Sequence, residues 1–274
     1  MNREWMNRYE VAVAVAAEAG QLALRYFDTA LDVEWKANAS PVTVADREAE
    51  QLLRTTLLGR FPRDGFLGEE FGEVPGESGF RWIIDPIDGT RNFVRGIPLW
   101  ATLVGLEYRG EPVAGVTHIP ALRQTFRALR GEGAFRDDRR IRVSDVDRLS
   151  EAQIFYSGIN WFIKGRCREA FFELCGRTQR QRGFGDFYGF VLVAQGSGEL
   201  MVDYGVNPWD VAAIRPLIEE AGGRFTAWDG TPTIHRTDTL ASNGKLHDEA
   251  LALLRAGSAP GFDPRVVEHA KEIT

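Results

Sequence analysis

The segment "DPIDGT" places two acids, Asp85 and Asp88, around a Pro-Ile pair directly after the apolar run "RWII". Pro86 fixes its own φ and has no N–H, which favours a sharp and defined exit from a strand. In such a turn both carboxylates, and the carbonyl of Ile87 between them, can point the same way. This hard-oxygen set suits Mg²⁺ rather than zinc. Asp is also common in ordinary turns and caps, so that alternative stays open for the two acids taken alone.

Gly89 and Thr90 follow these acids directly. A glycine followed by a hydroxyl residue at a candidate helix start exposes backbone N–H groups that can hold a phosphate. Metal-binding carboxylates beside a phosphate cradle together indicate a site that cleaves phosphate esters.

Three acids elsewhere are candidates for the same site, and each has an ordinary alternative. Glu69 in "GEE" could belong to a solvated acidic loop. Asp46 in "SPVTVAD" fits a capping box with Thr43 at a helix start. Asp210 in "NPWDVAA" follows Pro208 in the first turn of a predicted helix, where an acid complements the helix dipole.

Length and composition limit the class of protein. The 274 residues suffice for one large domain or two moderate ones, and 44% hydrophobic with 26% charged residues is ordinary for a soluble globular protein. A net charge of -6 argues against a nucleic-acid partner, which needs clustered Lys and Arg. A small phosphorylated ligand could still be held through bound cations.

The sequence also bears on compartment. The N-terminus "MNREWMNRYE" is charged and no apolar run approaches ~18 residues, so we expect neither a signal peptide nor a membrane span, and by default a cytoplasmic location. Cys167 and Cys175 are eight residues apart in a helical pattern, too distant for a disulfide, so we expect free thiols.

Helices are predicted to position the first acids. Apolar residues recur at steps of three and four from Met6 to Phe27, which predicts a long amphipathic helix. A second helix is predicted over 43–58, and residues 61–80 are predicted to be a polar, glycine-rich loop. The face expected to be shared on the second helix consists of Ala45, Ala49, Leu52 and Thr56 or Leu57.

Strand patterns follow residue 80. Four short runs separated by turn residues indicate an antiparallel meander: "RWIID", "WATLVGLEYRG", "EPVAGVTHIP" and "RQTFRALRGEGAF". Helical patterns at 164–175, 186–195 and 208–221 then alternate with strands such as "ELMVDYG" and "RFTAW". We therefore expect an N-terminal α+β part, 1–140, with most metal ligands, and a C-terminal α/β part, 141–274, that contributes Asp210 and substrate contacts.

The motifs together resemble the inositol monophosphatase family of Mg²⁺-dependent phosphomonoesterases. "GEE", "DPIDGTRNF" and "PWDVAA" followed by "EEAGG" occur in the family's order and approximate spacing, and "SPVTVAD" and "GEGAF" match further landmarks. The resemblance covers roughly residues 5–255. It implies a layered αβαβα sandwich of the inositol monophosphatase and fructose-bisphosphatase type, more than one Mg²⁺ ion per site, and a homodimer.

The resemblance also assigns roles residue by residue. In the family, a water on a metal attacks phosphorus, and a Thr hydroxyl with its Asp partner and a Glu activates that water. Gly89 and Thr90 match the phosphate grip. The catalytic group matches Asp46, Glu69 and Thr90, and the Mg²⁺ ligands match Glu69, Asp85, the Ile87 carbonyl, Asp88 and Asp210.

Three other segments resemble the family's histidinol-phosphatase branch, which acts in histidine biosynthesis: "TRNFVRGIPLWATLVGL", "RGFGDFYGFVLVAQG" and "ASNGKLHDEAL". L-Histidinol phosphate carries an ammonium group, which the carboxylates of Asp186 and Asp203 would favour over a neutral polyol. Asp186 could instead cap the helix that follows it. Arg91 could contact substrate or shield the acids, and Lys36 lies near a family position on the phosphate side.

Other esters and other classes of protein are alternatives to this function. Inositol monophosphate, a sugar bisphosphate or a nucleotide 3'-phosphate would be alternative esters, although no basic-aromatic patch for a nucleotide is evident. A non-catalytic sensor would be expected to have lost one of the matched residues, and none is lost. A zinc hydrolase is disfavoured because the histidines lack ligand spacing: His118, His235, His247 and His269.

Overall fold

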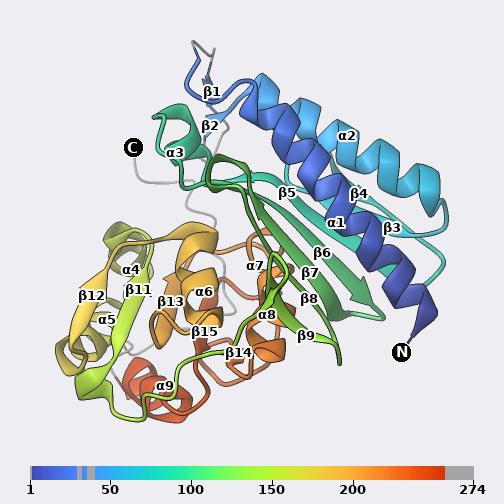
Figure 1. Ribbon diagram of the computed structural model, residues 1–274. Coiled ribbons are helices and arrows are strands. Elements are labelled where there is room, and N and C mark those ends of the chain that lie inside the picture. Colours follow the sequence, from blue (N-terminus) through green and yellow to red (C-terminus); the bar gives the residue numbers. More distant parts are fainter. Residues whose placement is uncertain (1, 30–32, 36–40, 257–274) are drawn as a thin grey trace. The chain divides into compact units, whose positions relative to one another are not determined.

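The computed structural model describes residues 2–29, 33–35 and 41–256. These residues form two compact units (Figure 1). The first comprises the chain up to Arg139 together with Trp209–Leu217, and the second comprises Arg140–Pro208 and the part from Ile218 onward. Asp210, which the division at residue 140 assigned to the C-terminal part, therefore belongs to the first unit.

The first unit is built on an eight-stranded sheet with the strand order β10-β9-β8-β7-β6-β5-β3-β4. Neighbouring strands from β5 to β9 are antiparallel, as the meander pattern predicted, whereas β3 runs parallel to β5. The strands are β3 (Gly65–Gly68), β4 (Gly72–Val74), β5 (Phe80–Asp88), β6 (Ala101–Tyr108), β7 (Glu111–Ile119), β8 (Gln124–Leu129), β9 (Gly133–Arg136) and β10 (Arg139–Arg140).

The prediction of a loop over 61–80 was wrong, because this segment contains β3 and β4. The two strands are short and rich in glycine, which hides their pattern in the sequence. They form a hairpin in which Gly68 pairs with Gly72. Glu69 and Glu70 therefore lie in the tight turn of a sheet edge, rather than in a long solvated loop.

Two long helices, α1 (Arg3–Leu24) and α2 (Val44–Arg60), lie side by side across one face of this sheet (Figure 1). α1 approaches β7 closely at Gly20, where a Cβ atom would come within 2.5 Å of the His118 ring. Shorter elements are β1 (Glu34–Trp35), β2 (Pro41–Val42), α3 (Thr90–Val94) and the 3₁₀ turn η1 (Pro120–Leu122).

The buried face of α2 differs from the predicted one. Ala45, Ala49 and Leu57 are buried as predicted, whereas Leu52 is half-buried and Thr56, the alternative to Leu57, is exposed. Two acids on the buried face hide its apolar periodicity from a sequence pattern. The buried side chains are Ala45, Asp46, Ala49, Glu50, Leu53 and Leu57.

The segment that carries Asp210 packs backbone-close against the strands β6 and β7. Gly105 and Gly115 pair with each other, and a Cβ atom on either would overlap with Ala212 or Ala213. The predicted helix over 208–221 is broken there into α7 (Pro208–Val211) and α8 (Ile214–Glu220). Pro216 explains the break, because it has no N–H to donate to a carbonyl four residues earlier.

The second unit is built on a five-stranded mixed sheet with the order β12-β11-β13-β15-β14. The predicted helix over 164–175 corresponds to α5 (Arg168–Arg177), and a separate helix, α4 (Ile159–Lys164), precedes it. The Phe162 and Phe171 rings of these two helices stack with centroids 4.0 Å apart. The elements are η2 (Leu149–Glu151), β11 (Gln153–Tyr156), α4 (Ile159–Lys164), α5 (Arg168–Arg177), β12 (Arg180–Arg182), α6 (Asp186–Ala194), β13 (Leu200–Tyr204), β14 (Arg224–Thr226), β15 (Asp238–Ser242) and α9 (His247–Ala256).

The two cysteines, Cys167 and Cys175, are free, as predicted. Burial raises the pKa of each thiol to about 12, so neither is a ready nucleophile. Within the part of the chain that the structure describes, no helix combines the length and apolar character that crossing a membrane requires.

Candidate active site

The strand β5 ends in an irregularity that brings its two acids together. Asp85 pairs with Leu103 and Asp88 with Ala101, so β5 carries one residue more than β6 between these pairs. Such a bulge interrupts the alternation of side chains, which would otherwise send positions three apart to opposite faces. Asp88 is therefore still part of the strand, and the predicted turn after Asp85 is this bulge.

Local hydrogen bonds hold the bulge in shape. The backbone N–H of Ile87 donates to Asp85 Oδ1 at 3.0 Å, and the Thr102 hydroxyl donates to the carbonyl of Pro86 at 2.9 Å. Asp85 is 2% exposed and Asp88 8% exposed. Both side chains are thus largely shielded from water.

Glu69 reaches the same place from the neighbouring parallel strand. Gly68, the last residue of β3, pairs with Ile84, and the N–H of Glu69 donates to the carbonyl of Ile84 at 3.3 Å. Glu69 therefore follows β3 next to the point where Asp85 lies on β5. This proximity depends on β3 being a strand, which the sequence did not predict.

Asp210 completes a cluster with the two acids of β5. One carboxylate oxygen from each of Asp85, Asp88 and Asp210 lies within 4.8 Å of the others. Burial raises the pKa of Asp85 well above its usual range, and the negative charges of Glu69, Asp88 and Asp210, followed by Asp46, raise it further. Glu69 lies outside the 4.8 Å group, yet it exerts the strongest of these charge effects on Asp85.

This arrangement fits a hard divalent cation. Asp85 and Asp88 are buried and Asp210 is half-buried. Converging carboxylates repel one another, and a bound cation would remove both the repulsion and the cost of burying the charge. Carboxylate oxygens are also the ligands that Mg²⁺ and Ca²⁺ prefer. The cluster in the first unit is therefore a candidate metal centre.

Gly89 and Thr90 stand at a helix start beside the cluster, as the sequence suggested. Gly89 has a φ of 85° and occupies the N-cap of α3, a left-handed conformation that a side chain would strain. Its carbonyl accepts from the N–H groups of Asn92 and Phe93. The Thr90 hydroxyl donates to the Ile87 carbonyl at 3.0 Å, so the hydroxyl and this predicted ligand atom are neighbours.

Asp46 forms the capping box that its motif allowed. Its Oδ2 accepts from the Thr43 backbone N–H at 2.8 Å and from the Thr43 hydroxyl at 2.6 Å. Burial, with smaller contributions from Glu70 and Glu69, raises the pKa of Asp46 to about 6 against the lowering effect of these bonds. In the described part of the chain Asp46 and Thr90 are not hydrogen-bonded to each other, so their partnership stays a prediction.

Glu50 is a buried acid beside the site that sequence reasoning missed. It lies one helical turn after Asp46 on α2 and accepts the backbone N–H groups of Glu70 and Phe71. Burial raises its pKa to about 7. No spacing motif marks Glu50, because the burial of Leu53, whose helix face it shares, is known only from the structure.

A second group of acids lies in the second unit. Asp203 is buried and accepts a short hydrogen bond from the Ser157 hydroxyl and a 2.9 Å bond from its neighbour's N–H at Tyr204. The Ser157 Oγ in turn accepts from the N–H of Asp186 at 3.0 Å. The structure thus joins the two predicted substrate residues through Ser157, which no sequence motif marks.

Asp186 has an unusual backbone. Its φ is 53°, in the left-handed region, although it is the first residue of α6. Gly185 occupies the N-cap position instead, packed so closely on Ser157 that a Cβ would lie 2.6 Å from the Ser157 Cα. Strain of this kind persists where surrounding contacts enforce it, and it is concentrated at functional sites.

Burial and charge act on this second group differently. Burial raises the pKa of Asp203 to about 7, opposed by its two hydrogen bonds and assisted by the charge of Asp186. Two hydrogen bonds therefore orient the Asp203 carboxyl group, and Asp186 supplies the neighbouring negative charge.

Of the remaining predicted residues, Arg91 contacts an aromatic ring. The Arg91 guanidinium lies over the ring of Trp35, 5.8 Å from its centroid. Lys36 and His269 lie outside the described residues.

The described histidines do not form a zinc site. His247 is buried between the hydroxyls of Thr226 and Ser242, at 2.9 and 2.8 Å, which satisfies both ring nitrogens. His118 Nδ1 bonds the Thr125 hydroxyl. The metal-capable group found among the described residues consists of aspartates.

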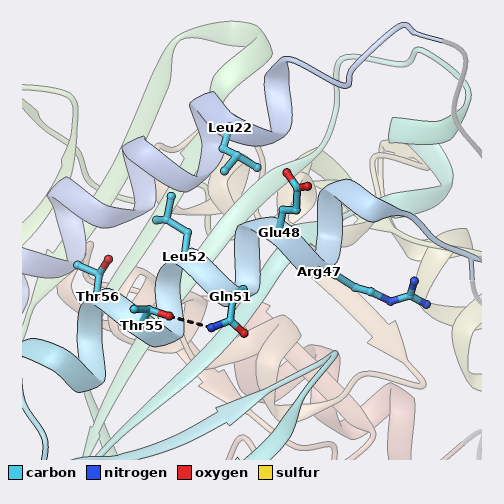
Figure 2. A pocket seen from close by; sticks show the side chains of 7 residues that line it. All are labelled: Leu22, Arg47, Glu48, Gln51, Leu52, Thr55 and Thr56. Carbon is cyan, nitrogen blue, oxygen red and sulfur yellow. Dashed lines mark hydrogen bonds between the residues drawn. The ribbon is translucent and has the colours of Figure 1, made fainter.

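A surface hollow of about 510 Å³ lies elsewhere in the first unit, along α2 beside Leu22 of α1 (Figure 2). Leu22 and Leu52 supply apolar side chains to its lining, and Gln51 donates to the Thr55 hydroxyl at 2.8 Å. None of the described residues that line it is a predicted site residue. The candidate chemistry therefore belongs to the acidic cluster and not to this hollow.

Comparison with known proteins places the chain in a family. Its residues 4–258 match the family model described as the inositol monophosphatase family. A Mycobacterium tuberculosis protein named histidinol-phosphatase is 41% identical over 253 residues, covering 90% of this chain and 97% of that protein. A Streptomyces coelicolor protein of the same name is 42% identical, covering 88% and 94%.

Solved structures agree with the sequence relatives. The extragenic suppressor protein suhB from Bartonella henselae superposes with a TM-score of 0.85 at 34% identity, covering 90% of this chain and 98% of that one. This likeness confirms the predicted fold, with mixed sheets and flanking helices. The chain belongs to the inositol monophosphatase family.

Proposed function

We propose that this protein is a Mg²⁺-dependent phosphatase that hydrolyses L-histidinol phosphate to L-histidinol and phosphate, as in histidine biosynthesis. As a member of its family with relatives named phosphatases, the chain is a phosphomonoester hydrolase that acts on small phosphorylated substrates. The metal, the ester and the residue roles are the proposal.

The observation that supports the metal is the convergence of Asp85, Asp88 and Asp210 within 4.8 Å. We propose that these three carboxylates, the Ile87 carbonyl and Glu69 hold more than one Mg²⁺ ion. When bound, Mg²⁺ would lower the pKa of a water ligand and would stabilise the negative charge that develops on the leaving oxygen.

The chain's own residues position the reaction and move the proton. We propose that Gly89 and Thr90 grip the phosphate, and that Thr90, Asp46 and Glu69 together accept the proton of the attacking water. Asp46 suits this role because burial brings its pKa to about 6, nearer to neutral pH than an ordinary carboxyl. Phosphoryl transfer depends mostly on such positioning and on charge stabilisation.

The ester is proposed from the second group of acids and from the relatives. Asp186 and Asp203 would bind the ammonium group of L-histidinol, because a carboxylate favours an organic cation over a neutral polyol. The two relatives reported above are named histidinol-phosphatases. Arg91, beside Trp35, remains a proposed substrate contact.

The test compares kcat/KM for L-histidinol phosphate, inositol monophosphate and fructose bisphosphate at one saturating Mg²⁺ concentration. We expect the histidinol ester to be preferred by at least about tenfold, which corresponds to about 1.4 kcal/mol of differential transition-state binding. A preference of that size for the inositol ester would instead establish the alternative, an inositol monophosphatase or another small sugar-phosphate phosphatase of the same family.

Two further proposals come from the sequence and the family alone. A homodimer predicts a mass near twice 30.6 kDa in light scattering coupled to size exclusion. A cytoplasmic location predicts that the protein fractionates with cytosolic enzymes.

A further inference from the structure

Glu50 is a carboxylate buried in the first unit without a role in the proposed chemistry. It is 0% exposed and lies on α2, one turn after Asp46. A carboxylate is costly to bury, so its position requires specific hydrogen bonds.

Those hydrogen bonds go to the turn that carries Glu69. Glu50 Oε2 accepts the backbone N–H of Glu70 at 2.8 Å, and Oε1 accepts that of Phe71 at 2.9 Å. The two donors are the residues directly after Glu69. Both carboxylate oxygens are thus used on one short stretch of backbone.

Gly68, the residue before Glu69, packs directly against the Glu50 carboxylate. A Cβ atom on Gly68 would overlap with Oε1 and Cδ of Glu50. Gly68 also precedes the N–H that Glu69 donates to Ile84. The backbone around Glu69 is therefore fixed on one side by β5 and on the other by Glu50.

We propose that Glu50 is a positioning residue that sets Glu69 for divalent-cation binding. The inference rests on the metal site of the proposed function. Glu50 acts through the backbone N–H groups of Glu70 and Phe71, as residues that orient metal ligands from behind generally do. Glu50 itself needs no contact with substrate or metal.

The first test substitutes Glu50→Gln and measures Mn²⁺ binding by titration calorimetry. The amide keeps the shape but turns an N–H₂ group toward a backbone N–H, so one of the two bonds is lost. We expect the Kd for Mn²⁺ to rise about tenfold, kcat to fall, and KM for the ester to stay within about twofold. Unchanged Mn²⁺ affinity in a folded variant would overturn the proposal.

The matched control is Glu48→Gln on the same helix. Glu48 lies at the surface and accepts a 2.7 Å hydrogen bond from the Tyr26 hydroxyl. Its substitution removes the same charge from α2 without touching the turn that carries Glu69. We expect Mn²⁺ affinity and activity equal to the wild type. A loss equal to that of Glu50→Gln would assign the effect to charge alone and overturn the positioning role.

A second variant, Gly68→Ala, keeps the glutamate at position 50 but displaces its carboxylate, with which the added Cβ atom would overlap. We expect the same weakening of Mn²⁺ binding, with circular dichroism and thermal unfolding showing a retained fold. This variant decides the matter if Glu50→Gln does not fold, and wild-type affinity in Gly68→Ala would then contradict the proposal.

The outcomes separate this inference from the proposed function. If the wild type does not hydrolyse L-histidinol phosphate while both variants bind Mn²⁺ more weakly, the positioning role holds and the substrate proposal fails. If the wild type is active and both variants match it in Mn²⁺ affinity, the substrate proposal holds and the positioning role fails.

Discussion

The two units bury acids in contrasting ways. In the first unit Asp85 lies among carboxylates, and each neighbouring charge that shifts its pKa is negative. In the second unit Asp203 accepts hydrogen bonds from Ser157 and Tyr204, and burial, with a smaller contribution from the charge of Asp186, raises its pKa. The crowded acids of the first unit could be relieved of their mutual repulsion by a cation, whereas Asp203 is held in place by hydrogen bonds.

A third buried acid shows what a structural role looks like. Asp64 receives two hydrogen bonds from the Arg8 guanidinium, at 2.8 and 2.9 Å, and a third from the Ser78 hydroxyl. Its charge is neutralised within the protein. The contrast with Asp85 supports the interpretation of the acidic cluster as a metal site rather than as part of the core.

The largest effect is expected from a substitution in the acidic cluster of the first unit. Asp88→Asn should lower kcat/KM for phosphate release by about a thousandfold, because several kcal/mol of charge stabilisation at the transition state depend on the metal. The fold should survive, since one of several mutually repelling carboxylates is removed. Thermal unfolding in chelator checks this, and activity within tenfold of the wild type would refute the role of Asp88.

The next effect concerns Asp203 and pH. Its folded pKa of about 7 lies above the ordinary value of 3.8, so the folded state keeps a proton that the unfolded chain releases between about pH 4 and 7. The free energy of unfolding contributed by this group therefore falls as pH rises through that window. Asp203→Asn, which cannot ionise, should gain about 2 to 3 kcal/mol relative to the wild type between pH 5 and 8.5.

Denaturant unfolding of Asp203→Asn and wild type at several pH values, with chelator present, measures this difference. A gap between the two proteins that stays constant with pH would show that Asp203 does not titrate in this range.

A smaller effect sharpens the role of the second group in substrate choice. Asp186→Ala should lose about tenfold more kcat/KM on L-histidinol phosphate than on inositol monophosphate, because only the first ester presents an ammonium group. Equal losses on the two esters would mean that Asp186 shapes the backbone near Ser157 without recognising charge.

The sequence predicted the acidic residues better than the elements that bring them together. The motifs around Asp85 and Asp88 indicated the family, and the meander from β5 to β9 followed from strand patterns. The strands β3 and β4 were missed because glycine-rich strands lack an apolar alternation. The parallel pairing of β3 with β5, which brings Glu69 beside Asp85, was therefore also missed, because strand pairing depends on contacts between distant segments.

Glu50 and Ser157 were missed for a different reason. Each acts through backbone N–H groups or a single carboxylate, and such contacts leave no spacing motif in the chain. Asp210 was identified from its motif, but its place in the first unit depends on the close approach of Ala213 to Gly115. A pattern of residues predicts chemistry, while tertiary contacts decide where it occurs.

The most direct test of the account is phosphate release from L-histidinol phosphate by the wild-type protein, measured first in excess chelator and then after Mg²⁺ is added back. We predict no turnover above the uncatalysed rate in chelator and full recovery with Mg²⁺, because the converging carboxylates of Asp85, Asp88 and Asp210 need a cation to act. Full activity in excess chelator would contradict the proposed metal site.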